Sequence, residues 1–164
     1  MTGVQKCALP ISLERPLGGG DPRAVPAASQ VDFLVEAFRI ADGGRAWQYR
    51  LRAEGTQPAV HQKHNLASPT PVTDGERVYA VFGTGQVVAL DVTGSLVWQR
   101  HLGEDHGPFD INWGAGSSPL VHDDHLIVLC DYPAASYLLA LDRRTGETDR
   151  KSTRLNSSHM SESR

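Results

Sequence analysis

The sequence predicts an all-β fold of repeated, four-stranded antiparallel sheets. From about residue 31 onwards, short segments rich in Val, Leu, Tyr and Phe alternate with Gly and Asp turn signals. No segment keeps a helical period over a convincing length. The strand pattern also recurs along the chain, with about 50 residues from one copy to the next. A repeat of this length with four strand signals per copy is typical of β-propeller blades rather than of a solenoid.

One template of the repeat occurs three times. Each copy has an apolar pair, an alanine, another apolar residue, usually an aspartate and a glycine turn, and the first two copies continue into a strand with a tryptophan. The copies are VEAFRIADGGRAWQYRL (35–51), VVALDVTGSLVWQRHL (87–102) and LLALDRRTGET (138–148). Their alanines, Ala37, Ala89 and Ala140, lie 52 and 51 residues apart. We therefore expect equivalent residues of the three copies to have equivalent places in three sheets.

A second template lies between these copies, as ASPTPVTDGERVYAVFG (67–83) and SSPLVHDDHLIVLCD (117–131). Asp74-Gly75 is a two-residue turn signal suited to a hairpin, because Asp and Gly tolerate the positive φ that such turns require. Together the templates predict half a blade over 31–51, a full blade over 67–102 and three strands of the next over 117–141. Residues 12–30, dense in Gly, Pro and Ala, are expected to form a loop or linker.

The two ends of the chain are related through the genetic code. If Asp149 to Thr153 are read as GAT CGG AAG AGC ACA, the opposite strand encodes Cys-Ala-Leu-Pro-Ile, which is the sequence of residues 7–11. With suitable synonymous codons the relation extends to Met1, with one mismatch at Lys6. Both ends resemble translated sequencing adapter, so we interpret residues 1–11 and 149–164 as artefact of a metagenomic fragment and expect them outside the sheets.

Charge, cysteine content and hydropathy narrow the function classes for residues 12–148. The end segments carry three net positive charges, so the total formal charge of −3 leaves −6 for this part. That balance argues against a nucleic-acid partner, which usually needs a basic face. Cys130 is the one cysteine in 12–148, which rules out an intrachain disulfide or a cysteine metal site there. Apolar runs such as LIVLC are far too short for a transmembrane segment.

Several groups of residues suggest chemistry that their context does not favour. The pairs His61/His64 and His122/His125 could ligate a metal, but residues i and i+3 of an extended chain point to opposite faces, and 122–125 aligns with the turn at 73–76. The glycine-rich FGTGQ and WGAGSS lack the strand-to-helix context and the lysine of a phosphate-binding loop. Ser117 and Ser118 lack a Gly-x-Ser-x-Gly elbow. We expect solvated turns, blade connections and no nucleophile.

The segments ALDVTGSLVW and ALDRRTGET resemble the pyrroloquinoline-quinone (PQQ) type repeat, Ala-x-Asp-x-x-Thr-Gly-x-x-x-Trp, of quinoprotein alcohol dehydrogenases and the BamB family. The resemblance covers about 31–148 and implies an eight-bladed parent and a periplasmic or otherwise extracytoplasmic location. In the first copy Arg39 replaces the aspartate, and the third copy stops at Thr148 before its tryptophan. The residues expected to have structural roles in the repeat are Trp47, Ala89, Asp91, Gly94, Trp98, Ala140, Asp142 and Gly146.

The resemblance leaves two function classes. A PQQ-dependent alcohol or sugar dehydrogenase would need PQQ, Ca²⁺ and a carboxylate base in the full-length parent. A non-catalytic scaffold of the BamB type would need no cofactor and would bind other proteins through loops on a propeller face. We favour the scaffold, because no catalytic, cofactor or metal residue can be assigned and a residue that recurs in every blade is rarely catalytic. The candidate contact loop is 103–116, with Asp105, His106, Phe109 and Trp113.

Overall fold

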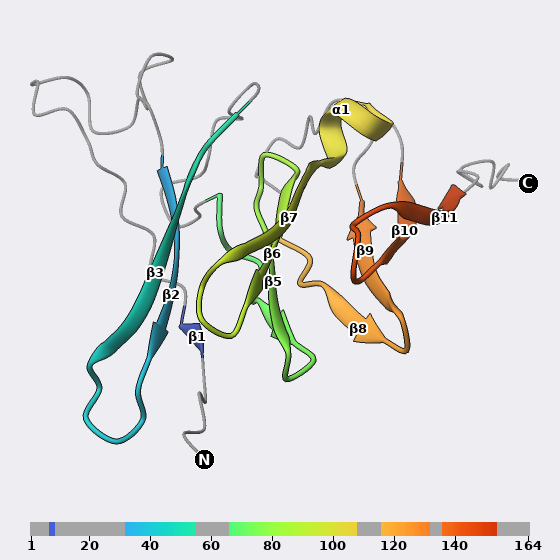
Figure 1. Cartoon of the computed structure of the whole chain (residues 1–164). Coiled ribbons are helices and arrows are strands. Elements are labelled where there is room, and N and C mark those ends of the chain that lie inside the picture. The colour runs from blue at the N-terminus through green and yellow to red at the C-terminus, as the bar shows by residue number, and fades with distance from the viewer. Residues whose placement is uncertain (1–6, 9–31, 55–65, 108–115, 132–135, 154–164) are drawn as a thin grey trace, which may run out of the picture.

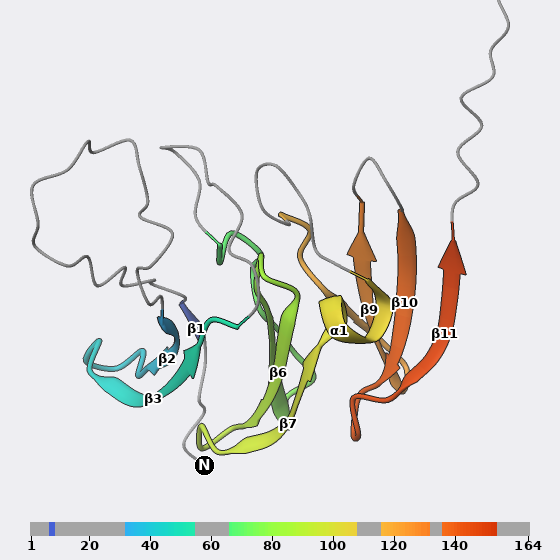
Figure 2. The same ribbon diagram turned by 90° about the horizontal axis from the view of Figure 1, so that it is seen from above.

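Three antiparallel sheets follow one another in chain order and lie face to face in a fan (Figures 1 and 2). The structure is a computed structural model and describes residues 7–8, 32–54, 66–107, 116–131 and 136–153. The first sheet has the strand order β1-β2-β3, the second β4-β5-β6-β7 and the third β11-β10-β9-β8. The predicted all-β architecture of four-stranded antiparallel blades is confirmed.

The elements have the following bounds. The first sheet consists of β1 (Cys7–Ala8), β2 (Asp32–Phe38) and β3 (Arg45–Arg52). The second consists of β4 (Val72–Thr73), β5 (Arg77–Val81), β6 (Gln86–Asp91) and β7 (Leu96–His101), followed by the short helix α1 (Leu102–His106). The third consists of β8 (Leu120–His122), β9 (His125–Cys130), β10 (Tyr137–Asp142) and β11 (Thr148–Thr153).

The hairpin formed by the last two strands of each sheet has the same register in all three sheets. Ala37 is paired with Trp47, Ala89 with Trp98 and Ala140 with Arg150, and in each hairpin the register shifts directly after the alanine. The repeat in the sequence is therefore a repeat in geometry. Arg150 occupies the position at which the first two sheets carry their tryptophan.

Two apolar cores join the sheets, and the second sheet contributes to both of them. Side chains alternate between the two faces of a strand, so Val88 and Leu90 of β6 pack toward Phe33 of the first sheet. Val87 and Ala89 of the same strand belong to the core shared with the third sheet. Because β6 is covered on both faces, five of its six residues are buried.

The expectation that both end segments lie outside the sheets is wrong for parts of each. Cys7–Ala8 pairs with β2, and β11 runs to Thr153, so the third sheet has four strands rather than three. The physical reason is that the edges of β2 and β10 present unpaired backbone donors and acceptors, which any extended segment can satisfy. From Asp149 to Thr153 the residues of β11 are exposed, so its pairing needs no apolar side-chain pattern that the sequence could reveal.

Candidate functional site

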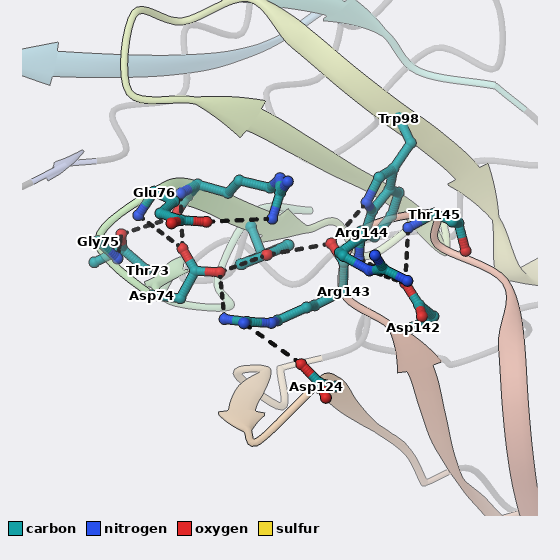
Figure 3. A network of polar contacts seen from close by, with 12 residues as sticks. Thr73, Asp74, Gly75, Glu76, Trp98, Asp124, Asp142, Arg143, Arg144 and Thr145 are labelled. Carbon is teal, nitrogen blue, oxygen red and sulfur yellow. Dashed lines mark hydrogen bonds and ion pairs between the residues drawn. The ribbon is translucent and has the colours of Figure 1, made fainter.

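The most specific contacts between the sheets are two tryptophans, each docked on the glycine turn of the next sheet. The Trp98 ring lies against Gly146, and its indole N–H donates to the carbonyl of Arg143 at 3.0 Å (Figure 3). Trp47 lies in the same way against Gly94 and donates to the carbonyl of Val92 at 2.9 Å. We call these two contacts the tryptophan joints.

Each joint requires glycine for two independent reasons. Gly94 and Gly146 have φ values of +89° and +74°, which side chains other than glycine adopt only with strain. A Cβ on Gly146 would lie 2.6 Å from Cε3 of Trp98, and one on Gly94 would lie 2.7 Å from Cδ2 of Trp47. The Gly and Trp of the repeat are thus two halves of one contact between neighbouring sheets.

The aspartates of the repeat hold the same turns in shape. Asp91 accepts hydrogen bonds from the amides of Thr93 and Ser95 and from the Thr93 hydroxyl. Asp142 accepts from the amides of Arg144 and Thr145. These bonds stabilise the charged carboxylate, so the pKa of each aspartate lies below its usual value, for Asp91 chiefly through Thr93. Both carboxylates are engaged within their own turn rather than aimed at a shared site.

The first copy builds its turn from different residues. Arg39 stands at the aspartate position, and its guanidinium forms an ion pair with Asp42 at 3.0 Å. Asp42 in turn accepts a hydrogen bond from the amide of Gly44 at 2.9 Å. The backbone closes as in the third copy, since the Arg39 amide donates to the Gly44 carbonyl at 2.8 Å. In the first copy the carboxylate therefore comes from Asp42 instead of the usual aspartate position, and the backbone hydrogen bond of the turn is the same.

Asp74 forms a second contact between the second and third sheets, although its place in the sequence predicts only a turn residue. Its carboxylate accepts from the amides of Glu76 and Arg77, from the Tyr79 hydroxyl at 2.9 Å and from the Arg143 guanidinium at 3.1 Å (Figure 3). The Asp74 side chain is only 4% exposed. A sequence signal did exist, because Asp74 aligns with Asp123 in the second template, but its partner is 69 residues away.

This buried contact shifts the pKa values of Asp74 and Tyr79. Burial alone would raise the pKa of Asp74, but the amides of Arg77 and Glu76, the Tyr79 hydroxyl and Arg143 together bring it below the usual value. Burial and the hydrogen bond to Asp74 raise the pKa of Tyr79 to about 12. At neutral pH the contact therefore consists of a carboxylate, a neutral phenol and a guanidinium.

Two more polar contacts connect neighbouring sheets. The buried Gln86 donates from its amide nitrogen to the Arg52 carbonyl, and its oxygen accepts from the Glu54 amide, both at 2.9 Å. Ser118 accepts from the amide of Thr70 at 2.9 Å. This hydrogen bond connects the segment before β4 to the segment before β8, so Ser118 takes part in a contact between the second and third sheets.

The candidate contact loop is described only over its first part. Asp105 lies in α1 with a carboxylate oxygen 3.5 Å from Nε of Arg100. The ring nitrogen Nε2 of His106 is 3.1 Å from the Thr148 hydroxyl. Burial, followed by the positive charge of Lys151, lowers the pKa of His106, so its ring is neutral at pH 7. Phe109 and Trp113 lie outside the described residues.

His122 and His125 flank a hairpin turn. The expectation that they point to opposite faces, as residues i and i+3 of an extended chain do, is therefore wrong. His122 and His125 are direct partners across the turn, so they lie on the same face of the hairpin. Their rings nevertheless approach different carboxylates, Asp123 at 3.5 Å and Asp149 at 3.2 Å. Within the described ranges, no group of three or more His, Cys, Asp or Glu side chains could hold a metal ion. His61 and His64 lie outside these ranges.

The glycine-rich FGTGQ segment and Cys130 both lie within the packed sheets or their turns. The FGTGQ segment forms the tight turn between β5 and β6, with the Phe82 amide bonded to the Gln86 carbonyl. Cys130 is fully buried, which raises the pKa of its thiol to about 11. A thiol in this environment stays protonated at neutral pH and is a poor nucleophile. None of the helices in the described part of the chain is long and apolar enough to cross a membrane.

Comparison with known proteins agrees with this architecture. The sequence model of the family described as outer membrane protein assembly factor BamB matches residues 16–162. No curated protein matches the chain in sequence. Among solved structures, the chain is similar to the quinohemoprotein alcohol dehydrogenase of Comamonas testosteroni, with a TM-score of 0.54 and 19% identity over 76% of this chain and 19% of that chain. A europium-containing methanol dehydrogenase gives a TM-score of 0.54 and 19% identity, over 76% of this chain and 22% of that chain.

BamB from Moraxella catarrhalis has a TM-score of 0.38 and 17% identity over 75% of this chain and 45% of that chain. The chain spans about a fifth of the length of the two dehydrogenases, and identities at this level inform on the fold alone. The repeated sheets and the similar folds define the chain as a run of PQQ-type β-propeller blades. The family match extends over nearly the whole chain, which belongs to the family of outer membrane protein assembly factor BamB.

Proposed function

We propose that this chain is part of a non-catalytic, extracytoplasmic propeller that binds other proteins during the assembly of outer membrane proteins. The proposal rests on one observation. The polar and aromatic side chains that recur in each copy of the repeat form turns and contacts between sheets. Trp47 and Trp98 are docked on glycines, and Asp91 and Asp142 are bonded to their own turns. A scaffold needs rigid blades that present binding loops. Residues that serve only to hold the blades together, as these do, fit that requirement.

A binding measurement tests the proposal. The full 164-residue chain would be titrated against a fluorescently labelled, unfolded outer-membrane β-barrel protein, with an unfolded cytosolic protein of similar length as the comparison. We expect saturable binding that favours the outer-membrane protein. Equal binding of both, or none, would contradict the proposal.

The surface involved can be located with a matched pair of charge reversals. Asp105→Lys changes the exposed start of the candidate contact loop. Glu76→Lys changes the exposed turn between β4 and β5, at the opposite end of β5 from the Gly85 turn whose carbonyl accepts from the first amide of α1. Because charges at the rim of an interface act mainly on association, Asp105→Lys should change the association rate and its salt dependence. Glu76→Lys should leave both unchanged.

The second candidate is a PQQ-dependent dehydrogenase, favoured by the similarity in fold to the two dehydrogenases. The described residues do not supply a cluster of carboxylates that could hold Ca²⁺. Titration of the chain and of its full-length parent with PQQ and Ca²⁺, followed by the absorbance of the quinone, separates the candidates. Stoichiometric, saturable binding would favour the dehydrogenase, and the scaffold predicts no saturation.

A further inference from the structure

The third sheet has one covered face and one open face. It lies at one end of the fan, with the second sheet on one side (Figure 2). Its covered face contributes Leu126, Val128 and Leu139 to the core shared with the second sheet. Because side chains alternate along a strand, the residues between these point the other way. The apolar residues on this open face are Leu120, Ile127, Leu129, Leu138 and Ala140.

The leucines of the open face are in contact with solvent. Leu120 is 60% exposed, and Leu129 and Leu138, which are direct partners across β9 and β10, are each 44% exposed. Leu120 is paired with Ile127, and Ile127 with Ala140, so the five side chains form one patch over three strands. With strands about 4.8 Å apart and about 3.3 Å of length per residue, the patch covers about 300 Å². Apolar patches of a few hundred Å² often mark interaction sites.

The second sheet shows what kind of surface fits this patch. By strand register, the open-face residues are equivalent in order to Val72, Tyr79, Val81, Val87 and Ala89. In the second sheet these five side chains pack on the apolar face of another antiparallel sheet. The surface that fits the open face is therefore a β-sheet face without charges.

The outer face of the first sheet does not have this chemistry. It carries Asp32, which forms an ion pair with Arg50 at 2.9 Å, and Glu36, which forms one with Arg45 at 2.8 Å. Covering these groups with leucines would take charges out of water without giving them new partners, which is costly. Head-to-tail stacking of one chain on the next is therefore unfavourable.

Of the sheet faces in the described ranges, the open face itself has the required chemistry. We propose that two copies of this chain pack the open faces of their third sheets against each other around a two-fold axis. Such a contact uses the same surface of both copies and closes at two. A four-stranded face of about 400 Å² per copy lies below the size of standard interfaces, so the dimer is weak and depends on concentration. This inference does not rest on the proposed role in outer membrane protein assembly.

Sedimentation equilibrium of the 164-residue chain tests the proposal. The concentration is varied from about ten to several hundred micromolar, the range in which weak complexes form. We expect the average mass to rise from 17.8 kDa toward twice that value and no further. A mass that stays at 17.8 kDa over the whole range, or assemblies larger than two copies, would overturn the proposal.

A matched pair of double variants locates the contact. Leu129→Thr with Leu138→Thr removes two leucines from the open face, and Leu96→Thr with Val97→Thr removes two similarly exposed apolar side chains from β7. Threonine keeps a high β-propensity, so circular dichroism should show unchanged strand content in both. The first pair should weaken self-association at least about tenfold, and the second should leave it unchanged. Equal effects of the two pairs would contradict the proposal.

Intermolecular nuclear Overhauser contacts provide a test that needs no variant. They are measured in a mixture of ¹³C-labelled and unlabelled chain at the highest concentration. We expect contacts between the methyl groups of Leu129 and Leu138 in different copies. Intermolecular contacts confined to the backbone of the edge strands β7 or β8 would show that the copies join by strand addition, and would overturn the proposal.

Discussion

Gly146 illustrates how single residues fix the arrangement of whole sheets. Its backbone conformation is left-handed, and the Trp98 ring leaves no room for a side chain. Trp98 itself is 8% exposed and lies between two sheets rather than on an open face. The turn aspartates, by contrast, act within their own hairpins. At the residue scale the repeat therefore separates into residues that shape a turn and residues that join two sheets.

Gly146→Ala should destabilise the fold more than Gly75→Ala. Both substitutions impose backbone strain of about 1–2 kcal/mol at positive φ, but only the first inserts a methyl group into an occupied joint, which adds about 1–3 kcal/mol for overpacking. Urea unfolding followed by circular dichroism measures both free energies of unfolding. Equal losses for the two variants would mean that Trp98 does not rest on Gly146.

Asp74→Asn should lower the free energy of unfolding by about 1–3 kcal/mol at pH 7, because it leaves buried partners poorly paired. The folded-state pKa of Asp74 is depressed, so its contribution is present above the unfolded pKa of about 3.9 and is lost as the pH falls through the folded pKa. The difference between wild type and variant should therefore shrink in acid.

The control for this prediction is Asp124→Asn. Asp124 also approaches Arg143, at 3.5 Å, but its side chain is 79% exposed. Its substitution should change stability by less than about 0.5 kcal/mol at any pH. A pH-independent loss for Asp74→Asn, or equal losses for the two variants, would contradict the assigned role of Asp74.

At the scale of strands, the sequence predicts most of what the structure contains. The strands of the second sheet were predictable because Asp-Gly and Thr-Gly turns bracket segments with strong β-propensity. β1 and β11 were not, since their pairing uses the backbone of an open edge and leaves no side-chain pattern. The Asp74 contact was also missed, because its partner Arg143 becomes a neighbour only when two sheets pack. Local signals fix elements, whereas contacts between elements need the three-dimensional arrangement.

The edge of β10 gives a prediction for this scale. A chain ending at residue 148 loses most of β11 and exposes that edge beside the apolar SYLLALD and LIVLC segments, a template for further strand addition. We expect it to aggregate or swap strands at about tens of micromolar, whereas a chain ending at Thr153 keeps the edge paired. Size-exclusion chromatography with light scattering compares the two. A stable monomer for the shorter chain would show that the β10 edge needs no cover.

At the scale of the molecule, three sheets joined by repeated contacts form a run of blades. The second sheet shares one core with the first and another with the third, and each interface adds one tryptophan joint. In such an array each blade is held in place by contacts with its neighbours, as in other repeat architectures.

Consecutive sheets of this chain are joined by an indole that rests on a glycine of the next sheet. Proton NMR of the 164-residue chain tests it directly, because an α-proton under an indole face is shifted upfield. We predict upfield α-protons for Gly94 and Gly146 with nuclear Overhauser contacts to Trp47 and Trp98 respectively, and loss of the Gly146 shift alone in Trp98→Leu. Random-coil α-proton positions at both glycines, without contacts to either indole, would contradict the account.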